Sequence, residues 1–341
     1  MDIKIDYDLS SHNSFAVPSC ARAFCVVTTD EDLDRALAYA AEKDLSLFIL
    51  GGGSNVLFTA DFPGLVAHIA CPGIATEIAP GNRVKVKLGA GENWHQIVMY
   101  CLKNSLYGIE NLALIPGTVG AAPMQNIGAY GVELAETFVS LEAVEINSGK
   151  RLIMAKGDCK FGYRDSIFKH VMANKVVITS VTLSLCTKPT VRADYGALKS
   201  ELDTLGPDMA VTPERVARAV MAIRQRKLPD PGLLPNAGSF FKNPEISQAR
   251  FDSLRQDYGD MPGFSQPGTE GKVKVPAAWL LDQAGWKGRR QGTVGVHQHQ
   301  AVVIINHGGG SGAEVLQLAK AMQESINELF GIALEPEVQV V

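Results

Sequence analysis

Three side chains with complementary chemistry lie far apart in this 341-residue chain. Arg164, in the segment FGYRDS, is a cation; Ser239, in NAGSFFKNP, carries a hydroxyl group; Glu337, in LEPEV, carries a carboxyl group. A fixed cation stabilises negative charge that develops during a reaction, and hydroxyl and carboxyl groups transfer protons. Together they suggest an active site that is assembled by folding.

Arg164 and Glu337 also have simpler explanations. Arg164 has two acidic residues available for a surface ion pair, Asp165 and Glu133. Glu337 has a competitor in Glu335, and residues two apart on an extended segment share a face, so alternation does not choose between them.

Ser239 stands between Gly238 and two phenylalanines. An exposed loop serine is not normally flanked by aromatic residues, so we expect Ser239 to be buried and its hydroxyl group to have a polar function. A nucleophilic serine is the alternative, but NAGSF lacks the G-x-S-x-G pattern of a nucleophile elbow.

A glycine-rich segment, GGGSN (51–55), follows an apolar run that reads as a buried strand. Glycines let backbone N–H groups approach a phosphate without a Cβ clash. The segment is not a Rossmann fingerprint, because Val56 stands at the sixth position, and it is not a P-loop. A tight turn at the strand exit explains it equally well.

A second segment, IPGTVGAAPMQNIGAYG (115–131), holds four glycines with small residues between them. So many helix and strand breakers predict a loop without regular structure, and long loops in compact domains tend to be functional. Two glycine-rich loops are able to hold a large phosphate-bearing cofactor with a flat heterocycle.

The overall composition is that of a soluble globular protein, with 46% hydrophobic and 20% charged residues. The net charge of −4 gives no global attraction to nucleic acid or to an anionic membrane. Two local basic clusters are compatible with solvated helix ends or with a small anionic ligand: Arg224, Arg226 and Lys227, and Lys287, Arg289 and Arg290.

The six cysteines are scattered and never form CxxC, which favours free thiols in a reducing cytoplasm. The N-terminus has no signal-peptide pattern, and no apolar run reaches 18 residues, so no membrane span is expected. His297 and His299 share a strand face but have no evident third ligand, so we expect no metal.

The elements that would position these residues are both strands and helices. Residues 23–70 read as β-α-β, with Thr29 as a helix cap, and 141–155 reads as a hairpin with Gly149 in its turn. Further strands are predicted at 84–88, 176–185 and 301–306. Helices are predicted after Asn93, over 212–227, over 276–284, and from a capping box at Ser311 and Glu314 to Gly331.

The ordered blocks GGGSN, IPG-x-VG-x-x-P-x-QNIGAYG, FGYRDS, KLPDP, NAGSFFKNP and LEPEV resemble the UDP-N-acetylenolpyruvoylglucosamine reductase family from about Asn13 to Val338. TVRADYGAL (190–198) resembles the tyrosine-loop insertion of the longer type. The resemblance implies an α+β fold, with a vanillyl-alcohol-oxidase-like (PCMH-type) FAD-binding domain and a smaller α/β substrate-binding domain. The implied parts are FAD-binding subdomain 1 (1–71, joined by 332–341), subdomain 2 (72–228) and the substrate domain (229–331).

The resemblance also implies site residues. Arg164 and Glu337 should flank the substrate carboxylate, with Ser239 as proton donor. Noncovalent FAD should be held by Gly52, Gly53, Ser54, Asn55, Pro116, Gly117, Thr118, Gly120, Ala121, Gln125, Asn126, Gly128, Ala129 and Tyr130. The uridine diphosphate part should be bound by Tyr195, Lys227, Asn243, Lys287 and Gln300. Gln339 stands where the family often has arginine, which leaves that flavin contact open.

The implied reaction is the NADPH-dependent reduction of UDP-N-acetylglucosamine enolpyruvate to UDP-N-acetylmuramate. In it FAD passes a hydride to C3 and C2 is protonated. The implied setting is cytoplasmic peptidoglycan precursor synthesis, hence cell wall biogenesis, cell shape and cell division, by a monomer. One alternative is an FAD-dependent oxidase of the same fold class that uses oxygen. Another is a nucleotide-sugar-binding protein without catalysis, against which the intact Arg164, Ser239 and Glu337 argue.

Overall fold

The computed structural model describes residues 1–206, 209–264 and 271–341. By internal contacts the chain forms two compact units. The first comprises 1–7, 21–54 and 62–226, and the second comprises 8–20, 55–61 and 227–341. This grouping does not test the three predicted functional parts, which stay a prediction.

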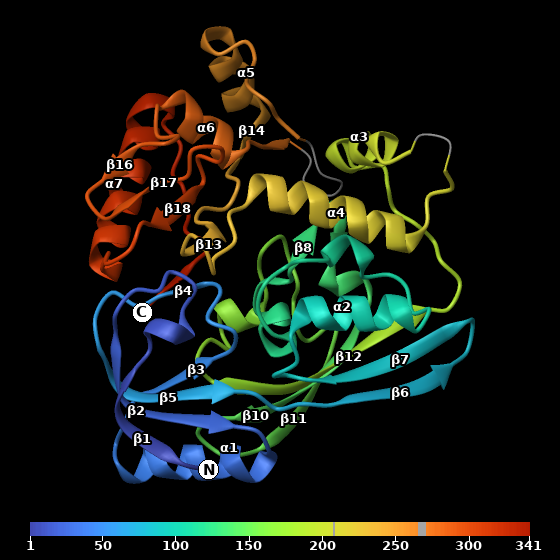
Figure 1. The fold of residues 1–341 in the computed structure, drawn as a ribbon, viewed down its shortest axis with the longest axis vertical. Coiled ribbons are helices and arrows are strands. Elements are labelled where there is room, and N and C mark those ends of the chain that lie inside the picture. The colour runs from blue at the N-terminus through green and yellow to red at the C-terminus, as the bar shows by residue number, and fades with distance from the viewer. Residues whose placement is uncertain (207–208, 265–270) are drawn as a thin grey trace. The chain divides into compact units, whose positions relative to one another are not determined.

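The first unit contains two sheets. A four-stranded sheet has the order β1-β2-β5-β3, in which β2, β5 and β3 run parallel. A five-stranded antiparallel sheet has the order β11-β10-β12-β7-β6 (Figure 1). The strands are β1 (Ile3–Asp8), β2 (Cys20–Val27), β3 (Leu47–Leu50), β5 (Phe62–Ile69), β6 (Ile74–Ala79), β7 (Arg83–Gly89), β10 (Phe138–Glu145), β11 (Arg151–Ala155) and β12 (Val176–Cys186).

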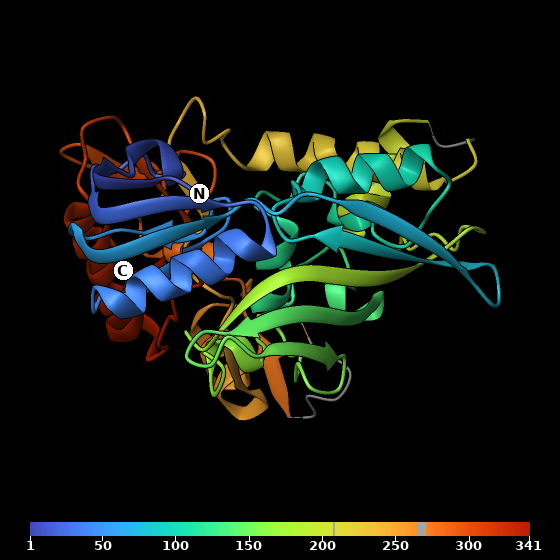
Figure 2. The ribbon, with the colours of Figure 1, turned by 90° about the horizontal axis from the view of Figure 1, so that it is seen from below.

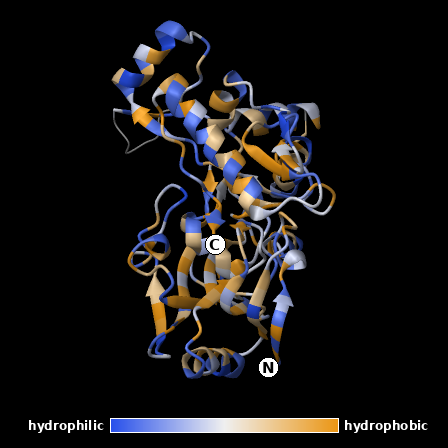
Figure 3. Ribbon diagram, turned by 90° about the vertical axis from the view of Figure 1, so that its left-hand side faces the viewer, coloured by the Kyte–Doolittle hydropathy of each residue, from blue (hydrophilic) through white to orange (hydrophobic). Residues whose placement is uncertain are grey.

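Helices bury one face each against these sheets. Helix α1 (Asp30–Glu42) runs beside β2 and β5 (Figure 2) and buries Leu33, Ala36 and Ala40. Helix α2 (Trp94–Lys103) lies over the five-stranded sheet and shares a core with β7 and β12. The helices carry hydrophilic as well as hydrophobic residues (Figure 3), as expected for elements with one buried face.

Helices α3 (Gly196–Thr204) and α4 (Pro213–Lys227) complete the first unit, apart from the last residue of α4. Short elements surround the glycine-rich segment 115–131. They are the 3₁₀ helices η2 (Glu110–Leu112), η3 (Val119–Gln125), η4 (Leu134–Glu136) and η5 (Ile167–Lys169), and the strands β8 (Gly128–Ala129) and β9 (Val132–Glu133).

The second unit is built on an antiparallel sheet with the order β13-β18-β17-β16. Its elements are η1 (Ser10–His12), β4 (Val56–Leu57), β13 (Asn236–Ser239), β14 (Glu245–Ser247), α5 (Gln248–Asp257), β15 (Lys272–Lys274), α6 (Ala277–Gln283), β16 (Arg290–Gln291), β17 (Val294–Val296), β18 (Val303–Asn306), α7 (Gly312–Phe330) and β19 (Gln339–Val340).

Local signals predicted several elements correctly. Thr29 caps α1 through the Asp32 N–H, and the hairpin β10–β11 turns at Gly149, whose φ is +67°. The capping box of α7 is complete, because Ser311 accepts from the Glu314 N–H while the Glu314 carboxylate accepts from the Ser311 N–H. The helix ends at Gly331 in the left-handed conformation, as predicted.

We expect Gly312→Ala to destabilise the protein strongly. A Cβ atom on Gly312 would lie 1.7 Å from the carbonyl oxygen of Phe58, and a backbone atom cannot rotate away. Such overpacking should cost about 3 kcal/mol. Thermal unfolding by circular dichroism should show a lower midpoint. Gly259→Ala is the control, because no atom lies within 4 Å of its added Cβ, and an equal loss in both variants would contradict the contact argument.

Candidate active site

The two glycine-rich segments of the first unit lie in close contact. A Cβ atom on Gly52 would lie 3.0 Å from Cα of Gly117, and one on Gly51 would lie 2.8 Å from the Thr118 hydroxyl. Gly117 itself has φ +104°, which favours glycine. The glycines at 51 and 52 are therefore required by the close approach of residues 117 and 118.

The loop 115–131 was predicted to lack regular structure, and this prediction was wrong. Residues Val119–Gln125 form the 3₁₀ helix η3, and β8 follows. The tight fit of its small residues explains the difference, because a Cβ atom on Gly120 would lie 2.6 Å from Cβ of Ala90. Contacts with the rest of the unit thus determine the conformation of a segment that has little intrinsic propensity for helix or strand.

Asn126 ends η3 in the left-handed conformation, with φ +44°. Its side-chain NH₂ donates to Glu133 (2.7 Å) and to the Gly162 carbonyl (3.0 Å), and its oxygen accepts from the Ala135 N–H (2.9 Å). Asn126 is 1% exposed, and its side chain makes these hydrogen bonds within the protein. A cofactor contact at Asn126 would therefore come from its backbone.

Further bonds tie the segment around Arg164 to the same loop. The Ser166 hydroxyl donates to the Met124 carbonyl at 2.7 Å. Lys169 donates both to the Gln125 side chain (3.4 Å) and to the carbonyl of Arg164 (3.1 Å). The predicted cation and the predicted cofactor loop are thus held together in one unit.

Arg164 has φ +51°, an uncommon backbone conformation for a residue with a bulky side chain. Its guanidinium lies against Gly128, where an added Cβ would be 3.6 Å from Nη1. The neighbouring Asp165, one of the two expected ion-pair partners, binds His170 at 2.8 Å. A strained residue held by its surroundings is typical of functional sites.

A second guanidinium lies close to Arg164. Burial lowers the pKa of Arg224, and the charge of Arg164 lowers it further. Burial also raises the pKa of Tyr130, against the opposing charge of Arg224. Two cations beside a glycine-rich loop favour an anionic ligand, which would reduce their repulsion.

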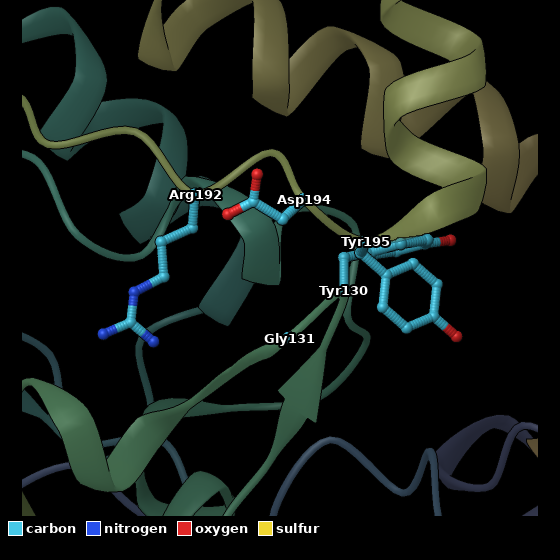
Figure 4. A pocket seen from close by; sticks show the side chains of 5 residues that line it. All are labelled: Tyr130, Gly131, Arg192, Asp194 and Tyr195. Atoms are coloured by element: carbon cyan, nitrogen blue, oxygen red, sulfur yellow. The ribbon is translucent and has the colours of Figure 1, made fainter. Parts of the chain in front are cut away.

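The tyrosine loop forms a hollow of about 360 Å³ with the end of the cofactor loop (Figure 4). Tyr195 is 51% exposed, and its ring meets that of Tyr130 edge-on, with centroids 5.6 Å apart. Arg192, also in the lining, is paired with Glu136. The hollow therefore joins a predicted substrate residue to a predicted cofactor residue.

Asn111 connects these two loops, and sequence reasoning missed it. It is 1% exposed, and its side-chain NH₂ donates to the carbonyls of Tyr130 and Arg192, at 3.0 Å each. Its position directly before the apolar run 112–115 was the available signal, since an amide buried with that run needs hydrogen-bond partners.

In the second unit, backbone pairing brings the segments of Ser239 and Glu337 together. The Glu337 N–H donates to the Phe240 carbonyl at 2.8 Å, and Phe241 pairs with Pro336. Ser239 ends β13 opposite Val303 of β18 and is half-buried. The two residues predicted for proton transfer thus lie on adjacent backbone segments.

The two candidate glutamates have different surroundings. Glu335 is exposed, and its carboxylate lies 3.4 Å from Lys242. Glu337 is half-buried, and its carbonyl accepts from the side chain of Asn55 at 3.0 Å. Asn55, predicted to contact the cofactor, is thus engaged in holding the Glu337 segment.

The other predicted substrate residues of the second unit lie on separate segments. Asn243 accepts from the Ala277 N–H (2.9 Å) at the start of α6, and Lys287 is paired with Asp282. Gln300 is half-buried just before β18, and Lys227 is exposed at the end of α4. Their role in binding stays a prediction.

Comparisons with known proteins identify the family. Residues 21–154 match the family described as FAD binding domain, and 230–341 match the C-terminal domain of UDP-N-acetylenolpyruvoylglucosamine reductase. The reductase of Amoebophilus asiaticus is 45% identical over 341 residues, covering all of both chains. That of Paraburkholderia phymatum is 46% identical, covering 97% of this chain and 96% of its own. The chain belongs to the UDP-N-acetylenolpyruvoylglucosamine reductase family.

Solved structures agree on the fold. The crystal structure of the Thermus caldophilus reductase has a TM-score of 0.68 at 23% identity, covering 99% of this chain and 98% of its own. The predicted α+β fold with a PCMH-type FAD-binding domain is confirmed, and the protein is an FAD-containing oxidoreductase. The close contact of Gly51 and Gly52 with residues 117–118 fits a cofactor that requires close backbone approach.

Residues 1–206, 209–264 and 271–341, which the structure describes, contain no helix long and apolar enough to cross a membrane. Within the same ranges, no group of three or more His, Cys, Asp or Glu side chains has the arrangement of a metal site.

We expect Asn111→Leu to loosen the tyrosine loop. The change removes both donors and leaves the carbonyls of Tyr130 and Arg192 without this partner, at a cost of about 1–3 kcal/mol. Trypsin should cut after Arg192 several times faster than in the unchanged protein. Asn104→Leu is the control, because Asn104 also donates to a tyrosine carbonyl but is exposed. Equal cleavage rates in both variants would contradict the role of Asn111.

Proposed function

We propose that this protein reduces UDP-N-acetylenolpyruvoylglucosamine to UDP-N-acetylmuramate, with NADPH as electron donor, in peptidoglycan precursor synthesis. Full-length identity of about 45% to reductases of this name supports the substrate. The observation that carries the chemistry is the backbone pairing that puts Ser239 beside the Glu337 segment, while Glu335 is engaged with Lys242. We further propose that the enzyme acts as a monomer in the cytoplasm.

FAD is proposed to be held noncovalently by residues 52–55, 116–118, 120–121, 125–126 and 128–130. When bound, FAD would carry the hydride from the nicotinamide to C3 of the enolpyruvyl group. The protein's contribution is to bind and orient the partners, to stabilise charge and to deliver a proton.

Arg164 is proposed to stabilise the negative charge that spreads into the substrate carboxylate as C3 is reduced. Its strained backbone and the Lys169 side chain, which binds both the Arg164 carbonyl and Gln125, support this role, because a group fixed in advance needs little reorganisation during the reaction. A fixed charge of this kind commonly lowers the activation barrier by roughly a few kcal/mol.

Ser239 is proposed to give its hydroxyl proton to C2. A free serine hydroxyl is a weak acid, so a neighbouring group must assist it. Glu337 is proposed to supply that assistance or to act on the carboxylate.

Binding of the diphosphate is proposed for Tyr195, Lys227, Asn243, Lys287 and Gln300. Lysine ammonium groups act as point charges for phosphate, and hydroxyl or amide groups add directional hydrogen bonds. The exposure of Tyr195 and Lys227 supports this role, because both are accessible to a ligand.

An anaerobic titration tests the function as a whole. Purified protein should be yellow, and NADPH should bleach its flavin bands. The enolpyruvyl substrate should then restore them. Reoxidation by oxygen with stoichiometric peroxide, and none by the substrate, would favour the oxidase alternative instead.

We expect Ser239→Ala to slow reoxidation by substrate by several orders of magnitude, because the change removes the proposed proton donor. FAD content and reduction by NADPH should stay near normal. Stopped-flow absorbance separates the two half-reactions. Near-normal reoxidation would rule out proton donation by Ser239.

We expect Glu337→Gln to slow reoxidation severely, because it keeps the shape but removes the titratable proton. Glu335→Gln is the matched control two residues away and should cost little, since Glu335 is exposed and pairs with Lys242. The same stopped-flow measurement applies. If Glu335→Gln were the crippling change, the assignment of the carboxyl group would be wrong.

A further inference from the structure

The first turn of α2 holds the segment that leads into the cofactor loop. The Trp94 N–H donates to the Gly117 carbonyl (3.1 Å), and the Trp94 ring N–H donates to the Leu112 carbonyl (3.0 Å). The Val119 N–H donates to the Glu92 carbonyl at 2.9 Å. These bonds flank Leu114 on both sides.

Leu114 has a backbone conformation that needs support. Its φ is +58°, in the left-handed region that costs a leucine about 1–2 kcal/mol. Its N–H donates to Nδ1 of His95 (3.0 Å), and its carbonyl accepts from Nε of Arg224 (3.2 Å). Two side chains, from α2 and α4, thus hold both backbone polar groups of one strained residue. We call His95, Leu114 and Arg224 the Leu114 anchor.

The direction of the bond fixes the protonation state of His95. Nδ1 accepts only when it carries no proton, so the ring must be neutral with its proton on Nε2. A protonated ring would turn an N–H toward the N–H of Leu114. Burial, then the charge of Arg224, lowers the pKa of His95 below its usual 6.5. Arg224 is the charged group that faces His95 from α4.

The position of Leu114 links this anchor to the cofactor. Leu114 lies three residues before Gly117, whose Cα would be 3.0 Å from a Cβ on Gly52. If the peptide at Leu114 turned to a relaxed conformation, the chain direction at Ile115 and Pro116 would change. The contact between the two glycine-rich segments would then open.

We propose that His95 is a positioning residue that keeps the 114–118 segment in its FAD-binding conformation, and that only its neutral form does so. This inference rests on the proposed cofactor role of residues 52–55 and 116–118. It has a thermodynamic consequence: if FAD favours neutral His95, protonation of His95 must weaken FAD binding.

The sign of the pH effect follows directly. FAD retention is full above the pKa of His95 and falls as the pH drops through that pKa, which lies below 6.5. The loss of one partly buried hydrogen bond corresponds to about tenfold in affinity.

The test follows FAD release from the diluted holoenzyme by the rise in free flavin fluorescence, from pH 5 to pH 8. Three proteins are compared: the unchanged enzyme, His95→Asn and His95→Phe. Asparagine can place its Oδ1 near the position of Nδ1 and accepts at every pH, whereas phenylalanine keeps a ring without an acceptor.

We expect release from the unchanged enzyme to accelerate about tenfold at the acidic end. His95→Phe should release FAD rapidly at every pH, and His95→Asn slowly at every pH. A His95→Asn enzyme that kept the acidic acceleration would overturn the proposal, as would a His95→Phe enzyme that matched the unchanged protein. Failure of the proposed cofactor role of these segments would look different, because Gly52→Ala, whose added Cβ would lie 3.0 Å from Cα of Gly117, would then release FAD no faster than the unchanged protein.

Discussion

The close contact between residues 51–52 and 117–118 determines much of the first unit. A Cβ atom on Gly51 would lie 2.8 Å from the Thr118 hydroxyl, and one on Gly52 would lie 3.0 Å from Cα of Gly117. Glycines offer few side-chain atoms to hold such an approach, so surrounding residues must fix its geometry. The first turn of α2, the Leu114 anchor and the bonds from Asn126, Ser166 and Lys169 supply that support. Many polar side chains therefore bind the loop, because the loop has few interactions of its own that would keep its conformation.

The limits of prediction follow from the range of each interaction. The capping box at Ser311 and Glu314 was predictable, because both partners lie within three residues and belong to one known pattern. The 3₁₀ helix η3 was not predictable, since the position of Gly120 within it depends on a close contact with Ala90, which lies far away in the sequence. Asn111 bonds to carbonyls 19 and 81 residues away, and no local pattern encodes such partners. Family resemblance named the candidate site residues, but it did not reveal the side chains that hold them.

Glu335 and Glu337 illustrate the same limit in the second unit. Their spacing puts both on one face of an extended segment, and the sequence alone offers no choice. Pairing with the segment that follows Ser239 gives them different partners: the Lys242 N–H donates to the Glu335 carbonyl, while the Glu337 N–H donates to the Phe240 carbonyl. Charge then completes the distinction, because Lys242 attracts the Glu335 carboxylate. The register of two short segments thus gives the two carboxyl groups different surroundings.

The discontinuity of the second unit has a consequence for biosynthesis. Residues 55–61 pair with the last residues of the chain, where Thr59 binds the Val341 carbonyl across 282 positions. At ribosomal speeds of 5–20 residues per second, this separation corresponds to a delay of roughly 15–55 s. During that time the backbone of Val56 and Leu57 lacks its parallel pairing with β19. The nascent chain therefore carries an unpaired strand edge through most of its translation, and such edges are exposed to pairing with other chains.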